Sequence, residues 1–151
     1  MYLLYSTNFE YYISMLFYSQ AKGVWTDSDG AVIVDGCYAG IGAGKNNPAM
    51  QNVHNVGPLP QGIYTMGPLM IHPPGDSLRH LGPCMVLAPS SANTMFGRGG
   101  FFIHLDNPTH PGLSSNGCIV CSSDKNATGA GKIQSIDALR AKGENLVTVT
   151  A

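Results

Sequence analysis

Charged side chains are scarce in this chain of 151 residues. Asp, Glu, Lys and Arg together make up 11% of it, and the formal net charge is −1. Recognition of nucleic acid or of anionic membrane surfaces needs a basic excess, which this composition does not supply. A long apolar run is also lacking, because Asn8, Glu10 and Ser14 interrupt the apolar N-terminal stretch. We therefore expect no nucleic-acid partner and no stable membrane insertion.

The N-terminus lacks the features of a secretory signal. No Lys or Arg precedes Lys22, whereas a signal peptide needs a basic start and a small-residue cleavage site. We expect the protein to be made in the cytoplasm without an ordinary signal peptide, so any work outside the cytosol requires another route of delivery. No pattern assigns a role to residues 1–16, an aromatic N-terminal segment.

Cysteine is also sparse, with only Cys37, Cys84, Cys118 and Cys121 present. Four cysteines in a chain of this length do not make the dense disulfide framework of a small secreted domain, and their spacing does not pair them. Hydrophobic residues make up 44% of the chain, which is enough for a core without such a framework. Because no internal repeat or low-complexity linker divides the chain, we expect residues 1–151 to form one domain.

Glycine and proline are plentiful, at 19 and 10 residues, and they separate short apolar stretches. This pattern predicts short strands joined by turns. Strands are predicted within residues 9–20 and at residues 31–34, 63–66, 84–88, 100–105, 118–122 and 145–150. Helical spacing occurs near the C-terminus, at Ile133, Ile136 and Leu139. The predicted fold is mainly β, a sandwich or barrel with one short C-terminal helix, and Trp25 is expected in its core.

Two segments carry a pattern typical of thiol chemistry. His104 lies at the end of an apolar stretch, and Cys118 follows a Ser-x-Gly turn. A thiolate is the attacking species in cysteine catalysis, and a nearby imidazole can take its proton. Gly117 allows close approach of the backbone to a carbonyl group, so the amides of Gly117 and Cys118 are candidates for an oxyanion hole. Cysteine is also a common buried packing residue, so this pattern alone leaves catalysis and packing open.

A short motif around the cysteine resembles a known family. The sequence Ser-Asn-Gly-Cys ending at Cys118, with His104 upstream, resembles the Ser/Thr-x-Gly-Cys signature of L,D-transpeptidase (YkuD-type) catalytic domains. The longer run Gly-Lys-Asn-Asn-Pro-Ala-Met-Gln-Asn at residues 44–52 is similar to the front half of type VI secretion L,D-transpeptidase-like effectors. Residues 102–107 and 115–120 are similar to the back half of the same effectors.

The resemblance covers residues 17–151 and implies an L,D-transpeptidase-like β fold with the cysteine in a cleft. It implies action on peptidoglycan stem tetrapeptides, as an L,D-carboxypeptidase or by D-amino acid exchange, through a thioester on Cys118. His104 would act as general base and then as general acid. No metal or other cofactor is implied. The implied catalytic residues are Cys118, His104, Ser115 and Gly117, and the implied substrate-binding residues are Asp106, Asn107, Asn116 and Asn47.

The resemblance also implies a biological setting. It points to an antibacterial toxin that type VI secretion delivers and that acts in the periplasm of target bacteria. The missing signal peptide agrees with this route. The implied partners are the peptidoglycan tetrapeptide and a cognate immunity protein that protects the producing cell.

Three of these residues have two readings each. Ser115 would orient His104 or shape the cleft. Asp106 would orient His104 or structure its own loop. Asn47 suits a substrate amide and equally suits a hydrogen bond to its own backbone in a turn. The histidines outside the motif, His54, His72, His80 and His110, are expected in loops, with structural or solvated side chains.

Departures from the family pattern leave alternatives open. Asn116 stands where ordinary members have His, and Val120-Cys121 stands where they usually carry a polar residue, often Arg, so carboxylate recognition must differ. Cys118 and Cys121 form a Cys-x-x-Cys, which also suits a zinc or redox domain. On an alternating strand, however, the two would face opposite ways. A catalytically silent peptidoglycan-binding module is the other alternative.

Overall fold

The computed structural model describes residues 14–126 and 128–151. Within these residues the chain forms a β-rich domain with one α-helix and three short 3-10 helices. The strands are β1 Met15–Ser19, β2 Val24–Thr26, β3 Val32–Val34, β4 Cys37–Ala39, β5 Gly62–Met66, β6 Met70–Ile71, β7 Pro83–Pro89, β8 Phe101–Leu105, β9 Ile119–Cys121 and β10 Leu146–Thr150. The helices are η1 Gly42–Gly44, η2 Pro48–Met50, η3 Arg79–Leu81 and α1 Lys132–Ala141.

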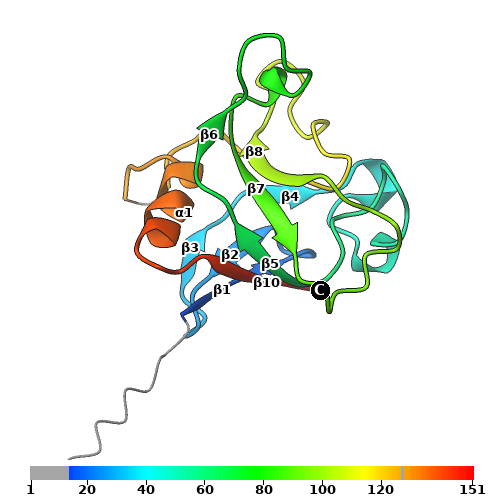
Figure 1. The fold of residues 1–151 in the computed structure, drawn as a ribbon, viewed down its shortest axis with the longest axis horizontal. Coiled ribbons are helices and arrows are strands. Elements are labelled where there is room, and N and C mark those ends of the chain that lie inside the picture. Colours follow the sequence, from blue (N-terminus) through cyan, green and yellow to red (C-terminus); the bar gives the residue numbers. More distant parts are fainter. Residues whose placement is uncertain (1–13, 127) are drawn as a thin grey trace, which may run out of the picture.

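The strands form a single sheet that curves into a nearly closed, barrel-like shape (Figure 1). Its order is β3-β2-β1-β10-β5-β7-β8-β9-β4, with β6 paired to β7. Two pairs are parallel, β1 with β10 and β8 with β9. The Cys37 amide of the last strand donates to the Gly23 carbonyl in the β1–β2 turn, at 3.0 Å, so the two ends of the sheet approach each other. The predicted mainly β fold with one C-terminal helix is confirmed.

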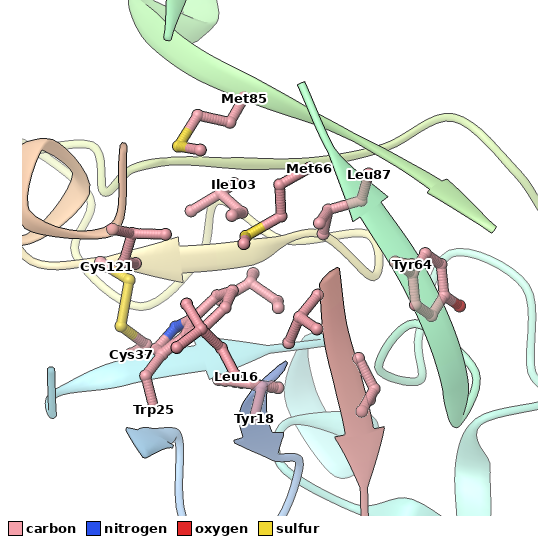
Figure 2. Close-up of a cluster of buried hydrophobic side chains, with 14 of the residues drawn as sticks. Leu16, Tyr18, Trp25, Cys37, Tyr64, Met66, Met85, Leu87, Ile103 and Cys121 are labelled. Carbon is pink, nitrogen blue, oxygen red and sulfur yellow. A yellow bond between two sulfur atoms is a disulfide. The ribbon is translucent and has the colours of Figure 1, made fainter. Parts of the chain in front are cut away.

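One face of the sheet encloses the core, as Figure 2 shows. The alternation of apolar residues along the strands explains this, because successive side chains on a strand point to opposite faces. Trp25 is fully buried, as predicted, and its ring lies 5.4 Å from that of Tyr18. On β8 and β9, Ile103, Ile119 and Cys121 point into this core. The residues between them therefore point to the other face of the sheet.

A disulfide joins Cys37 of β4 to Cys121 of β9, within the core (Figure 2). The two residues are register partners in the antiparallel β4–β9 pair. Cys84 and Cys118 are free thiols. Cys121 thus faces away from Cys118, as strand alternation predicted, and the Cys-x-x-Cys is not a dithiol.

Three strands, β2, β4 and β6, were not expected from the sequence, because each has only two or three residues. The strand expected within residues 9–20 corresponds to β1, and its first part, residues 9–13, lies outside the described residues. No helix among the described residues has the length and apolar character needed to cross a membrane.

Candidate active site

The parallel pair of β8 and β9 places the two predicted catalytic residues on the same face of the sheet. His104 is the register partner of Val120, and the Phe102 amide donates to the Cys118 Sγ at 3.4 Å. Cys118 directly precedes β9 and lies two residues before Val120, so strand alternation puts its side chain on the same face as those of Val120 and His104. Cys118 therefore lies beside Phe102, one step along the sheet from His104, on the face opposite the core.

His104 is held as a base rather than as a cation. The side chain is 3% exposed, and its Nδ1 lies 2.9 Å from the Leu105 carbonyl oxygen. Because a carbonyl only accepts hydrogen bonds, Nδ1 carries the proton and Nε2 keeps a lone pair. Burial of the imidazole lowers its pKa below the ordinary 6.5, although the bond to Leu105 opposes this shift. A neutral His104 is thus ready to accept a proton at Nε2.

Cys118 is protonated at rest, because burial raises the pKa of its thiol above the ordinary 9.0. Three groups act in the opposite direction and favour the thiolate. They are the amide of Phe102, the amide of Cys118 itself and the positive charge of Arg98. The site therefore combines a neutral thiol with a neutral imidazole, and these three groups only partly offset the cost of a buried negative charge on sulfur.

Ser115 is the centre of the turn that carries the cysteine. Its Oγ donates to the Cys118 carbonyl at 2.6 Å and accepts from the amides of Gly40, at 2.8 Å, and Gly117, at 3.1 Å. These bonds agree with the reading in which Ser115 shapes the cleft. They also occupy the Gly117 amide, which the sequence suggested for an oxyanion hole. The Cys118 amide, which lies close to its own sulfur, is the better-placed donor.

Asp106 structures its own loop. Its carboxylate accepts from the Tyr38 hydroxyl at 2.7 Å, from the Gly112 amide at 2.8 Å and from the Asn107 amide at 2.9 Å. The Tyr38 hydroxyl in turn accepts from the Ser114 amide at 3.0 Å. The Nδ1 of His104 is bonded to Leu105, not to this carboxylate. The influence of Asp106 on His104 is electrostatic, since its negative charge raises the imidazole pKa.

The three asparagines predicted to bind substrate lie in different places. Asn107 lies beside His104 at the rim of the larger cavity described below, with its Oδ1 bonded to Thr109. Asn116 is exposed and lines a second cavity. Asn47 caps η2, accepting from the Ala49 amide and donating to the Ala43 carbonyl. The structure thus shows Asn47 in its turn-forming role.

Two open cavities are lined by residues close in sequence to Cys118 or His104. The larger, of about 520 Å³, is lined by His104 together with residues 80–83, 105–108 and 113–114. The smaller, of about 250 Å³, is lined mainly by polar groups, including Asn116. The segment that leads to Cys118 reaches both cavities, since Ser114 lines the larger one and Asn116 the smaller one.

Sequence reasoning missed three residues near the site. Arg98 is 8% exposed and donates to the Asn116 carbonyl, in the turn that carries Cys118. His80 is exposed as expected, but it shares the larger cavity with His104. His72 was expected at the surface but is 8% exposed, because its ring packs edge-on against Phe102, 5.7 Å between centroids. Single histidine and arginine residues carry no periodic pattern, so only the folded chain brings them to the site.

Gly117 leads to the first testable prediction. Its φ is +134°, and an added Cβ would lie 2.6 Å from the Arg98 Nη2 and 2.7 Å from the Phe101 ring. Gly117→Ala should therefore combine backbone strain with a steric clash, and lower the free energy of unfolding by roughly 2–4 kcal/mol. Urea denaturation measures this. Gly75→Ala is the matched control, because Gly75 has φ +90° and nothing within 4 Å of its added Cβ. Equal losses in the two variants would contradict the clash.

Comparison with known proteins agrees with the β fold. The solved structure of the helical cell shape determining protein Pgp2 from Campylobacter jejuni is similar at 15% identity and a TM-score of 0.53, over 91% of this chain and 47% of that one. L,D-transpeptidases from Mycobacterium tuberculosis H37Rv and Mycobacterium smegmatis are similar at 16% and 15% identity, with TM-scores of 0.48 and 0.45. They are matched over 92% of this chain and over 58% and 59% of their own. The chain thus spans about half the length of the solved structures it matches.

No protein with curated annotation matches the chain significantly. At its level of identity, the likeness to Pgp2 shows the fold alone. The family model described as the Tlde1 domain, however, matches residues 34–146. That range contains β4, the nucleophile turn and both strands of the Cys118–His104 pair. Because the match covers most of the chain, this protein belongs to the Tlde1 domain family.

Proposed function

We propose that this protein is a cysteine-dependent enzyme that modifies peptidoglycan stem peptides, with Cys118 as nucleophile and His104 as general base. One observation carries the proposal. Cys118 and His104 share one face of the β8–β9 pair, and His104 is fixed in the tautomer that leaves Nε2 able to accept a proton. Membership of the Tlde1 domain family supports the substrate class, since the family resembles L,D-transpeptidases.

The chemistry follows from the neutral state of both groups. His104 Nε2 takes the thiol proton as Cys118 Sγ attacks the carbonyl between the L-centre of the diamino acid and the terminal D-alanine. The Cys118 amide donates to the oxyanion of the tetrahedral intermediate. The C–N bond then breaks, the imidazolium gives its proton to the leaving D-alanine amine, and a thioester remains. Water yields a tripeptide, or the amine of a D-amino acid yields an exchanged tetrapeptide.

The pH dependence of this reaction provides the second prediction. Burial holds the His104 pKa below 6.5, so the imidazole stays a base as the solution becomes mildly acidic. The kcat/KM for D-alanine release should fall to half of its plateau value at a pH below 6.5. A pH–rate profile of the wild type measures this. A half-maximal rate at or above pH 6.5 would contradict the lowered pKa of His104.

We further propose that type VI secretion delivers the protein to the periplasm of target bacteria, where it acts as an antibacterial toxin. Peptidoglycan is located there, and effectors of this kind are what the Tlde1 match and the motif resemblance suggest. A producing cell then needs a cognate immunity protein. Co-expression with neighbouring open reading frames, scored by growth after periplasmic targeting of the toxin, tests this partner.

The test of the activity is direct. Purified protein is incubated with disaccharide-tetrapeptides, with and without an excess of D-methionine, and the products are identified by mass spectrometry. Loss of D-alanine indicates hydrolysis, and replacement of D-alanine by D-methionine indicates exchange. If neither product forms but the protein pulls down peptidoglycan, the chain is the catalytically silent binding module instead, and the enzyme proposal fails.

A further inference from the structure

The Arg98 side chain connects three separate segments of the chain beneath the nucleophile. It lies in the loop before β8 and is 8% exposed. Its guanidinium donates to carbonyl oxygens of Gln51, Gly57, Pro58 and Asn116, the last at 3.1 Å. The side chain also lies over the Phe101 ring, 5.3 Å from its centroid. Only arginine has a planar fork of donors that can span so many acceptors.

The charge of Arg98 is not neutralised by its partners. The four acceptors are carbonyl oxygens, and no carboxylate forms a salt bridge with Arg98 among residues 14–126 and 128–151. A buried cation without an acidic partner is costly to stability, and so it is rarely retained for packing alone. The positive charge therefore remains available to any negative charge that forms nearby.

Two groups that can become negative interact with Arg98, the Tyr64 hydroxyl and the Cys118 thiol, and Tyr64 has the larger effect on the Arg98 pKa. Burial holds the pKa of Tyr64 far above its ordinary value, so near neutral pH the charge that can form beside Arg98 is the Cys118 thiolate. Gly117 has no side chain, and an added Cβ there would lie 2.6 Å from the Arg98 Nη2, so the guanidinium packs directly against the residue before Cys118. The positive charge of Arg98 lowers the pKa of Cys118, and a Cys118 thiolate raises that of Arg98. The two effects are reciprocal, as they must be for interacting charges.

The same contacts fix the geometry of the turn. Arg98 holds the Asn116 carbonyl, the Leu59 amide donates to the Gly117 carbonyl at 2.9 Å, and Ser115 Oγ holds the Cys118 carbonyl. Three successive carbonyl groups are thus bound from three directions. The backbone of the turn is therefore held in one conformation, and this fixes the orientation of the Cys118 amide and side chain.

From these contacts we propose that Arg98 is the positioning residue of the nucleophile, which clamps the Asn116–Gly117 peptide and holds a fixed positive charge beside the Cys118 sulfur. The expected effect of Arg98 on turnover rests on the proposed function. The expected effect of its charge on the reactivity of the Cys118 thiol does not, and it can be measured without peptidoglycan.

Alkylation of Cys118 by iodoacetamide across a range of pH, followed by peptide mass spectrometry, tests the charge. Arg98→Gln and Arg98→Met should shift the alkylation midpoint upward and slow alkylation near neutrality by roughly twofold or more, while the amides of Phe102 and Cys118 continue to favour the thiolate. Arg98→Lys keeps the charge and should keep most of the wild-type midpoint. Arg140→Gln on α1 is the matched control, since it removes the same charge far along the chain and should not move the midpoint.

Turnover tests the clamp separately. Arg98→Lys lacks the fork that spans four carbonyls, so kcat for D-alanine release should fall at least about tenfold with the alkylation midpoint retained. Near-UV circular dichroism shows whether Arg98→Gln is folded. If it is folded and its alkylation midpoint is unchanged, the proposed effect of the Arg98 charge on Cys118 is wrong. If Arg98→Gln does not fold, Arg98→Lys still tests the proposal. Turnover equal to the wild type in Arg98→Lys would show that the guanidinium is not needed to position the Asn116–Gly117 peptide. If the wild type lacks turnover yet the midpoint shifts, the proposed function fails and the role of the charge stands.

Discussion

Cys118→Ala is expected to abolish the release of D-alanine from disaccharide-tetrapeptides, with a fall in kcat on the order of 10⁴-fold or more. The reason is that the proposed reaction passes through a thioester on this sulfur, and alanine offers no nucleophile in its place. Quenched time courses with mass spectrometric detection measure the loss. Cys118→Ser should also be nearly inactive, because a hydroxyl is far less acidic than a thiol and His104 is bonded to the Leu105 carbonyl, without the carboxylate partner that supports the histidine of serine hydrolases.

Cys84→Ala is the matched control for this loss. Cys84 is the other free thiol and is the register partner of His104 on β7, but it lies on the opposite side of β8 from β9. In the part of the chain that the structure describes, Cys84 makes no hydrogen bond to the turn that carries Cys118, and its charge would raise the pKa of Cys118. Its removal therefore does not weaken the proposed nucleophile, and turnover should not fall more than about twofold below the wild type. Intact-mass spectrometry provides direct evidence for the acyl-enzyme. The wild type trapped with substrate should carry an acyl group, and Cys118→Ala should not. Equal D-alanine release by Cys118→Ala and the wild type would exclude the thiol mechanism.

The longer elements of the fold could be predicted from the sequence because each contains enough residues to show a period. β5, β7, β8 and β10 have five or seven residues, and α1 has ten, so their apolar patterns were visible. β4 has three residues, all buried, and therefore shows no alternation. Its place at the edge of the sheet depends on pairing with β9, more than 80 residues further along the chain. Contacts of this kind have no local signature.

The candidate site divides in a similar way. His104 and Cys118 lie at the ends of apolar segments and belong to a motif, so the sequence identified them. Arg98 lies in a loop and His80 in the short 3-10 helix η3, and their relation to the site comes from tertiary contacts only. The oxyanion donor was predicted as a pair of amides, but the Ser115 Oγ already accepts from the Gly117 amide. Which amide is free depends on side-chain hydrogen bonds that the spacing of residues does not encode.

The disulfide between Cys37 and Cys121 lies close to this site and should contribute strongly to its stability. It closes a loop with a sequence separation of 84 residues. By the loop-entropy argument, its removal should lower the free energy of unfolding by roughly 3–5 kcal/mol and the Tm by roughly 10 °C. Disulfides persist in oxidising compartments, which include the bacterial periplasm. The bond therefore suits the proposed place of action.

Removal of the disulfide should reduce activity as well as stability, because it ties the edge strand β4 to β9. The segment that begins with β4 supports the catalytic loop, since Tyr38 bonds to Asp106 and the Gly40 amide bonds to Ser115 Oγ. Thermal unfolding and D-alanine release should both be measured for Cys37→Ala/Cys121→Ala and for wild type with and without dithiothreitol. Reduction should lower the Tm and the turnover of the wild type but leave the double variant unchanged. If the reduced wild type keeps its Tm, the disulfide does not constrain the fold. If it loses stability but keeps full turnover well below its Tm, β4 does not position the loop.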